Sequence, residues 1–250
     1  MSNKKILGID VGASGIKGAI VDLEKGDFIT ERIRLETPNP ATPHAMARTF
    51  AQVVKALSWK GDVIGCGFPA IIKNGIAQSA ANIEETWVDT NVETIFSKAC
   101  GKTVKVINDA DAAGIASMTY GDGRNQKGTV LFITIGSGLG SAVFTDGQLV
   151  PNTELGHLFI DDELAETYAS GRARKRLNLS WDEWGYRFNK YLRHLERLFS
   201  PDLILLGGGG SKRFDQFQDQ LRLRTPVRPE GMQNKAGIVG AAYYGAQFLK

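Results

Sequence analysis

Runs of apolar residues separated by turn signals recur along the first part of the chain and predict a β-sheet. Residues 4–10 form a buried-strand pattern, and a turn rich in glycine leads into a second apolar run at residues 18–22. Residues 28–35 alternate between apolar and polar side chains, which predicts a third, antiparallel strand. Two further apolar runs predict buried strands at residues 62–68 and 104–107.

Apolar residues at helical spacing predict helices that pack against this sheet. Thr42 and Pro43 provide a cap and a first helical position, and residues 45–57 continue the helical pattern. A second helix is expected at residues 92–99, and an Ala-rich helix follows the strand that ends at residue 107. Later in the chain the patterns predict helices at residues 163–176, 180–198 and 236–249, a strand at 203–206, a helix opened by Ser211 and a loop at 225–229.

An internal repeat decides the expected architecture. Residues 130–146 repeat the order of residues 6–22, which is strand, glycine turn, strand and acidic turn. Gly12 corresponds to Gly136, and we expect the second turn to be shorter by two positions. Two such sheets predict two α/β lobes that face one another over a cleft, with both glycine turns pointing into it; a chance match of two apolar hairpins is the alternative. The expected lobes are residues 1–108 together with 237–250, and residues 109–236.

Composition narrows the class of protein. The chain has 250 residues, of which 42% are hydrophobic, and this is ample for one large domain or two modest ones. An excess of 30 basic over 27 acidic residues is too small to indicate nucleic acid. Cys66 and Cys100 are isolated, which indicates neither a disulfide framework nor a cysteine-built zinc site and favours the cytoplasm. No apolar run reaches the ~18 residues of a membrane span, and no targeting segment precedes the first strand pattern.

Asn108 and Asp109 lie where an apolar strand runs into the Ala-rich helix. Unpaired N–H groups at a helix N-terminus favour a carboxylate there, so Asp109 should remain ionised. An ionised carboxylate suits a base that takes a proton from an alcohol. The alternative is that either residue only caps the helix.

Three glycine-rich segments follow predicted strands and have the properties of phosphate-binding turns. In the first, Gly12 and Gly15 allow backbone N–H groups to approach an anion, Ser14 adds a hydroxyl and Lys17 a cation. Asp10 is suited to hold Mg²⁺ through water. Glycines in a tight hairpin also serve the turn alone, which is the alternative. The other two segments contribute the candidates Gly136, Ser137, Gly138, Gly208 and Gly209.

Polar side chains gather in the predicted loops. Glu154 and His157 lie three positions apart, and Asn82 comes from another loop. With Asn108 and Asp109 they offer the mixture of donors and acceptors that neighbouring sugar hydroxyls require. The alternative is an ordinary exposed loop, and a zinc site at His157 would need further His or Cys ligands.

The chain resembles the ROK family of sugar kinases, within the superfamily of actin, Hsp70 and hexokinase. The resemblance rests on the segment around Asp109, on the glycine-rich turns, and on S-A-A-N-I, N-T-E-L-G-H and N-K-A-G-I-V-G-A-A. Inside that family it is most similar to the polyphosphate glucokinases. The resemblance runs from Gly8 to Ala242 and implies a two-lobed, ribonuclease H-like α/β fold with duplicated mixed sheets flanking a cleft.

The resemblance also implies roles for single residues. Most ROK proteins follow the G-H element with a cysteine-rich zinc motif that ends in a glutamate; here the cysteines are missing, and E-T-Y-A-S remains. The resemblance therefore implies no zinc, and it carries a sugar-binding role over to Glu166. It makes Asp109 the general base and assigns glucose hydroxyls to Asn82, Asn108, Glu154 and His157.

The implied reaction transfers the terminal phosphoryl group of polyphosphate, with ATP as a second donor, to the 6-hydroxyl of glucose with Mg²⁺. The implied protein is a cytoplasmic homodimer that binds neither nucleic acid nor membranes. The basic residues Lys17, Arg172, Arg174, Lys175 and Arg176 are candidates to guide a polyanion, although a basic run at a helix end is also typical of a solvated surface. Two alternatives stay open, an ATP-dependent ROK hexose or N-acetylhexosamine kinase and a sugar sensor without catalysis.

Overall fold

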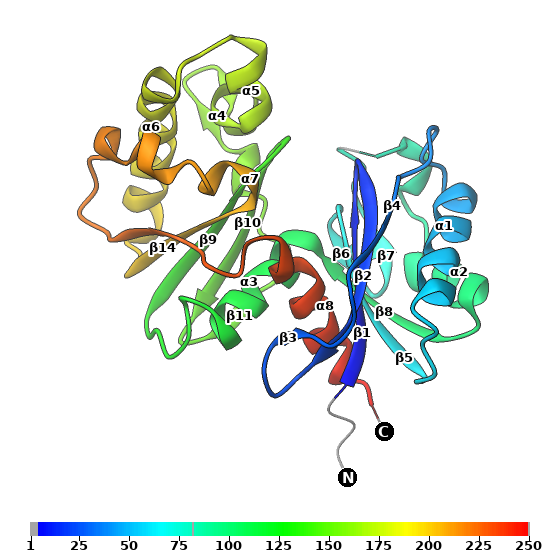
Figure 1. Ribbon diagram of the computed structural model, residues 1–250. Coiled ribbons are helices and arrows are strands. Elements are labelled where there is room, and N and C mark those ends of the chain that lie inside the picture. Colours follow the sequence, from blue (N-terminus) through cyan, green and yellow to red (C-terminus); the bar gives the residue numbers. More distant parts are fainter. Residues whose placement is uncertain (1–4, 82, 250) are drawn as a thin grey trace. The chain divides into compact units, whose positions relative to one another are not determined.

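The computed structural model describes residues 5–81 and 83–249. The chain forms two compact units (Figure 1). Unit 1 comprises Met1–Ala116 and Lys235–Lys250, and unit 2 comprises Ser117–Asn234. Unit 1 is therefore built from both ends of the chain, whereas unit 2 is one continuous segment.

A mixed six-stranded sheet forms the centre of unit 1. Its central strand β1 pairs antiparallel with β2 and parallel with β5, which pairs parallel with β8. Every residue of β5 is buried, as expected for a strand with neighbours on both sides and layers on both faces. The strands are β1 (Lys5–Gly12), β2 (Gly15–Asp22), β3 (Asp27–Phe28), β4 (Ile33–Leu35), β5 (Val63–Phe68) and β8 (Thr103–Asn108).

The strand expected at residues 28–35 is wrong in one respect, because two short strands replace it. Both β3 and β4 pair with β2, and the backbone between them leaves the ladder. The hydroxyl of Thr30 accepts the N–H of Ile20 at 3.1 Å, which satisfies a donor of β2 at the interruption. A side chain thus replaces one ladder bond, which an alternating pattern of polarity cannot reveal.

Four helices pack around this sheet, α1 (Pro43–Ala56), α2 (Val92–Cys100), the first turns of α3 (Asp109–Tyr120) and α8 (Ala236–Ala246). Thr42 caps α1 with Pro43 in the first turn, as predicted, and Asn91 caps α2. An aromatic cluster joins α1 and α2 to the sheet, with the rings of Phe50 and Phe96 stacked at 4.3 Å. The remaining short elements are the hairpin β6 (Ile72–Lys73) and β7 (Ile76–Ala77), and the 3-10 turns Glu85–Trp87 and Gln233–Lys235.

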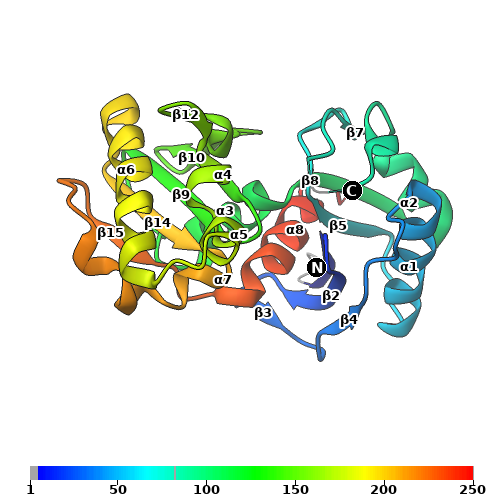
Figure 2. The same cartoon turned by 90° about the horizontal axis from the view of Figure 1, so that it is seen from above.

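Helix α8 lies beside the sheet of unit 1 (Figure 2), and glycines form the contact between them. A Cβ atom at Gly65 would lie 1.7 Å from the carbonyl oxygen of Ala241, and one at Gly8 would lie 2.1 Å from that of Ile238. On the helix itself, a Cβ atom at Gly240 would lie 1.6 Å from the carbonyl oxygen of Ala112 in α3. The backbones therefore meet in direct contact, and no larger residue fits at these positions.

A five-stranded sheet in the order β11-β10-β9-β14-β15 forms the centre of unit 2. β9 pairs antiparallel with β10 and parallel with β14. The aromatic side chains of α6 and Phe217 pack with the apolar residues of β9 and β14 into one core. The strands are β9 (Thr129–Ile135), β10 (Leu139–Thr145), β11 (Gln148–Val150), β14 (Leu203–Gly207) and β15 (Val227–Pro229). The loop predicted at residues 225–229 is wrong for β15, a short edge strand that ends in a proline, where no N–H is needed.

The two glycine hairpins correspond as the repeat predicts, but the expected difference between their turns is wrong. Gly12 pairs with Gly15 and leaves a two-residue turn, whereas Ile135 pairs with Leu139 and leaves a three-residue turn. The second turn is thus the longer one. The N–H of Gly136 donates to the carbonyl of Gly138 at 3.0 Å, which closes the extra residue into the turn.

The helices of unit 2 follow the capping signals. Ser180 and Glu183 form the predicted capping box at the start of α6 (Trp181–Phe199). The single helix expected at residues 163–176 is wrong, because Ser170 is extended and caps a new helix. That segment contains β13 (Glu163–Leu164), which pairs with β12 (Phe159–Ile160), then α4 (Ala165–Ala169) and α5 (Gly171–Arg176). Ser211 ends the short helix α7 (Gly208–Ser211) and does not open one; the 3-10 turns are Leu155–His157, Phe214–Gln216 and Gln218–Gln220.

The units divide inside α3, after Ala116, and again after Asn234. The boundary expected after residue 108 falls at the start of α3, and the one expected after residue 236 falls in α8. The first turns of α3 belong to unit 1 because their backbone packs against Gly240. Over the part of the chain that the structure describes, no helix combines the length and apolar content needed to cross a membrane.

Candidate functional site

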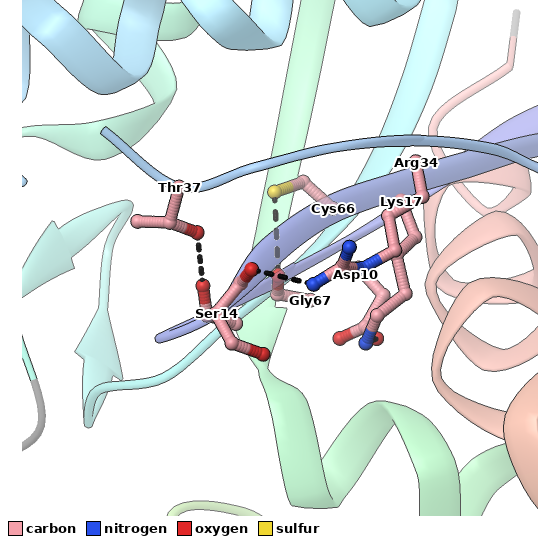
Figure 3. A network of polar contacts seen from close by, with 8 residues as sticks. Asp10, Ser14, Lys17, Arg34, Thr37, Cys66 and Gly67 are labelled. Carbon is pink, nitrogen blue, oxygen red and sulfur yellow. Dashed lines mark hydrogen bonds and ion pairs between the residues drawn. The ribbon is translucent and has the colours of Figure 1, made fainter. Parts of the chain in front are cut away.

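The first glycine turn lies beside a row of charged side chains on three neighbouring strands (Figure 3). Asp10 on β1 is paired in register with Lys17 on β2, and Lys17 with Arg34 on β4. The ammonium of Lys17 lies 3.1 Å from the carboxylate of Asp10, and both side chains are partly exposed. The register thus places one acid and two bases side by side at the end of the hairpin.

Two residues that sequence reasoning missed hold this turn. The guanidinium of Arg34 donates to the carbonyl of Ser14 at 2.8 Å, and the hydroxyl of Thr37 donates to the carbonyl of Gly12 at 2.5 Å (Figure 3). A Cβ atom at Gly15 would lie 2.8 Å from Nε of Arg34, so glycine makes room for this side chain. The sequence shows Arg34 and Thr37 only as polar residues in and after a predicted strand. The pairing of β4 with β2 is what reveals that they lie near the turn.

Asp10 has the chemistry of a magnesium ligand. Mg²⁺ in phosphate-transferring proteins takes one or two carboxylates, several waters and the substrate phosphates. A single, partly exposed carboxylate beside a phosphate-type turn fits that pattern. A Cβ atom at Gly237 would lie 3.1 Å from the carboxyl carbon of Asp10, so glycine keeps this space open. Among residues 5–81 and 83–249 no group of three or more His, Cys, Asp or Glu side chains is placed to hold a metal alone.

Asn108, at the end of β8, performs the capping of α3. Its buried side-chain oxygen accepts the N–H groups of Ala110 at 2.9 Å and Asp111 at 3.1 Å, and its amide donates to the carbonyl of Ala70 at 3.1 Å. Asp109 is half-buried and accepts the N–H of Ala110 at 2.8 Å. The cap is thus assigned to the asparagine, while the carboxylate stands at the first residue of the helix.

Unit 2 brings three of the sequence-predicted residues together. Nε2 of His157 lies 3.8 Å from a carboxylate oxygen of Glu166 on α4. Burial raises the pKa of the nearby Glu154; the charge of His157 opposes this, and that of Glu166 adds to it. Two carboxylates and an imidazole therefore share one small polar region.

Ser141 on β10 fixes the segment that carries Glu154, and sequence reasoning missed it. Its buried hydroxyl donates to the carbonyl of Thr153 at 2.5 Å and accepts the N–H of Leu155 at 2.9 Å. The backbone on both sides of Glu154 is thereby attached to the sheet. A serine inside a strand gives no such signal in the sequence.

The second and third glycine turns both belong to unit 2. They lie next to each other at the carboxyl ends of two parallel strands, β9 and β14. A Cβ atom at Gly208 would lie 2.7 Å from the carbonyl oxygen of Ile135, and one at Gly171 would lie 2.7 Å from that of Gly136. Gly208 also has a φ of 78°, which favours glycine. The candidates Gly136, Ser137, Gly208 and Gly209 are exposed, and Gly138 is partly exposed.

The basic run on α5 is partly engaged within the protein. Arg174 donates to the carbonyl of Leu179 and lies 4.2 Å from the ring centre of Trp181. Arg176 donates to the carbonyl of Thr167 at 3.0 Å. These two guanidinium groups thus brace unit 2, which weakens the expectation that they guide a polyanion. Asn82, expected to bind sugar, lies outside the described residues.

Comparison with known proteins gives consistent matches. The ROK family model matches residues 6–183. The chain is 44% identical over 236 residues to a polyphosphate glucokinase of Mycobacterium tuberculosis (strain CDC 1551 / Oshkosh), which covers 94% of this chain and 89% of that protein. It is 42% identical over 242 residues to a polyphosphate glucokinase of Mycobacterium leprae (strain TN), covering 96% of this chain and 74% of that one.

Solved structures agree in fold. The inorganic polyphosphate/ATP-glucomannokinase of Arthrobacter sp. strain KM is similar with a TM-score of 0.95 and 50% identity, over 98% of this chain and 99% of that one. A ROK family glucokinase of Streptomyces griseus, in complex with glucose and AMPPNP, has a TM-score of 0.85 at 23% identity, over 97% of this chain and 99% of that one. The second likeness concerns the fold alone.

Proposed function

Because the chain belongs to the ROK family, we propose that it is a kinase which transfers the terminal phosphoryl group of inorganic polyphosphate to the 6-hydroxyl of glucose. The observation that carries this proposal is the 44% identity to a polyphosphate glucokinase over 94% of the chain. ATP is proposed as a second donor, since the similar Arthrobacter protein is a polyphosphate/ATP-glucomannokinase.

Asp109 is proposed as the general base. Its carboxylate stands at the first residue of α3, where the helix dipole favours the ionised form, and Asn108 performs the capping. An ionised carboxylate there accepts the proton of the sugar 6-hydroxyl as that oxygen attacks phosphorus. The phosphoryl group moves from the donor to the sugar oxygen, and the shortened donor leaves with the bridging oxygen.

The glycine turns are proposed to bind the phosphates. In unit 1 the residues are Gly12, Ser14, Gly15 and Lys17, and in unit 2 they are Gly136, Ser137, Gly138, Gly208 and Gly209. Backbone N–H groups and a lysine stabilise charge that develops on the transferred group without reorganising. Asp10 would hold Mg²⁺ through water, and the ion would supply further positive charge to the phosphates.

Sugar recognition is proposed for Asn108 and for the polar group Glu154, His157 and Glu166. Carboxylate oxygens accept hydrogen bonds from sugar hydroxyls, and an imidazole N–H donates one. A site built to hydrogen-bond hydroxyls rejects analogues that lack them, because its buried polar groups would then remain unpaired. Asn82 is proposed as a further contact on the family resemblance alone.

The deciding experiment compares glucose 6-phosphate formation with polyphosphate and with ATP, each donor freed of the other. We expect turnover with polyphosphate in the wild-type protein. Activity with ATP alone would contradict the proposed donor and favour an ATP-dependent ROK sugar kinase. Glucose binding without activity from either donor would favour a sugar sensor.

The same assay tests the proposed base. A positioned general base contributes roughly 10²–10⁴-fold in rate, so Asp109→Asn should reduce kcat by about that factor while glucose binding, measured by calorimetry, is retained. If the variant kept more than about a tenth of the wild-type kcat, Asp109 would not be the base.

We also propose that the protein acts as a homodimer in the cytoplasm. In support of the compartment, Cys66 and Cys100 are both free thiols, as is usual for cytosolic proteins. Light scattering on the purified protein measures the assembly directly.

A further inference from the structure

A hollow of about 970 Å³ lies on unit 2, and the described residues that line it include neither those of the glycine turns nor those proposed to bind sugar. Its lining includes the outer face of α6, the β12 strand and the segment before β15. The basic residues in this lining are Lys190, Arg193, His194, Arg197 and Arg224, and we call them the basic groove.

Four of these residues form one stripe along α6. Positions 190, 193, 194 and 197 follow the spacing i, i+3, i+4, i+7, which places side chains on one face of a helix. The opposite face of α6 is buried in the core through residues such as Trp184, Phe188 and Leu195. The stripe therefore faces solvent along two turns, about 10 Å at ~1.5 Å per residue.

Both acidic groups of the lining already have partners, and one of these partners is the lysine of the groove itself. The carboxylate of Asp161 pairs with Lys190. One oxygen of Glu196 accepts the backbone N–H groups of Arg224 at 2.8 Å and Thr225 at 2.7 Å. Within the part of the chain that the structure describes, the guanidinium groups of Arg193 and Arg197 make no hydrogen bond or ion pair. Exposed cations thus outnumber the acids that could neutralise them.

Stability does not explain this stripe. Like charges three or four positions apart repel one another and destabilise a helix. Lys190 pairs with Asp161, but the described contacts give Arg193 and Arg197 no hydrogen bond or ion pair that would offset this repulsion. A bound polyanion would remove the repulsion, and several adjacent guanidinium forks suit repeated phosphate groups.

We propose that the basic groove binds an internal stretch of an inorganic polyphosphate chain, apart from the end that reacts. This inference rests on the proposed function and extends it, since a polymeric donor offers a long internal stretch of phosphates beyond the reacting one, whereas ATP and tripolyphosphate offer only two more. The near balance of charge over the whole chain confines such binding to local clusters like this one.

The test uses the full chain with the double substitution Arg193→Gln and Arg197→Gln. We expect the KM for long-chain polyphosphate to rise on the order of tenfold at 0.1 M salt, with kcat little changed. The salt dependence of log(kcat/KM) should become shallower by roughly one to two, because fewer counterions are released. Kinetics with ATP and with tripolyphosphate should match the wild type, since neither has the internal stretch of phosphates that the groove is proposed to bind.

A matched control removes the same charge elsewhere. Arg48 and Lys55 are exposed on α1 of unit 1, and Arg48→Gln with Lys55→Gln should leave the KM for long-chain polyphosphate unchanged. An equal rise in that control would overturn the proposal, because net charge alone would then explain the effect. So would an unchanged KM in the groove variant, or a parallel loss with ATP and tripolyphosphate.

Direct binding separates this inference from the proposed function. Equilibrium binding of long-chain polyphosphate, measured by calorimetry without glucose, should weaken in the groove variant but not in the control. Light scattering checks that both variants keep the wild-type assembly; a changed assembly in the groove variant alone would make the groove a contact between copies and overturn the proposal. A wild-type protein that binds polyphosphate in the groove yet forms no glucose 6-phosphate from it would contradict the proposed function alone.

Discussion

Single side chains outside any motif hold the candidate site. Arg34 and Thr37 bind the carbonyl groups of the first glycine turn, and Ser141 binds the backbone on both sides of Glu154. Each fixes backbone whose neighbours are proposed to contact substrate. Their effect should therefore be seen in substrate affinity more than in folding.

Arg34→Gln tests this positioning role. Loss of the hydrogen bond to the Ser14 carbonyl should loosen the turn and raise the KM for the phosphoryl donor. The expected rise is a few-fold, because one exposed hydrogen bond contributes about 1 kcal/mol. The KM for glucose should not change. Arg32→Gln removes the same charge from an exposed neighbouring position and is the control. An equal effect of both substitutions would show that charge, not the hydrogen bond, matters.

Glu230 gives unit 2 a pH-dependent stability. Its side chain is buried, and burial raises its pKa; the N–H of Met232 opposes the shift, and the charge of Asp122 adds to it. The folded protein thus holds this proton more tightly than the unfolded chain does. Below the unfolded pKa both states are protonated, and stability is lost as pH rises from there through the raised folded pKa.

Glu230→Gln removes that titration and keeps an acceptor for the Met232 N–H. We expect the variant's free energy of unfolding to exceed that of the wild type by an amount that is near zero at pH 4 and grows towards pH 7. Urea unfolding across this range measures the difference, with the exposed Glu163→Gln as control for a lost surface charge. A variant that is less stable than the wild type at pH 7 would contradict the explanation.

At the scale of elements, backbone contact between α8 and its neighbours is the tightest packing in unit 1. Gly240→Ala would place Cβ 1.6 Å from the Ala112 carbonyl, so the helices must separate, at a cost of about 1–3 kcal/mol or more. Gly101→Ala is the comparison, because open space surrounds that residue and only its φ of 67° opposes alanine. Thermal unfolding should show a larger loss for Gly240→Ala, and equal losses would argue against the steric account.

Elements with strong local signals were predictable from the sequence. Thr42 with Pro43 and the box of Ser180 with Glu183 act within one helical turn, so α1 and α6 begin where predicted. The strand β15 depends on its pairing with β14, which local patterns do not contain, whereas the break at Ser170 has a local cap, to the N–H of Ala173, that apolar spacing alone does not show. The same holds for the candidate site. Glu154 and His157 are close in the sequence and could be predicted as a pair, whereas Arg34 could not, because only strand pairing brings it to the turn.

At the scale of the whole molecule, unit 1 depends on the last residues of the chain. Ile238, Val239, Ala241 and Ala242 of α8 are fully buried, and they cover β1 and β5. Unit 2 has its own sheet and core within one continuous segment.

A chain that ends at residue 234 tests this dependence. We expect β1 and β5 to lose most of their protection in hydrogen exchange, because their apolar surface is uncovered, while β9 and β14 keep theirs. The full chain is the reference for both sheets. Retained protection in β1 and β5 would show that the sheet of unit 1 is stable without α8.

The close packing of α8 against β1 and β5 also determines when unit 1 can fold during translation. The ribosome makes β1 (Lys5–Gly12) long before α8 (Ala236–Ala246), so this strand stays incompletely packed until the helix has been made. A stop codon before residue 236 would therefore damage the unit whose first strand was made earliest, and unit 1 cannot complete its packing on the ribosome before α8 is made.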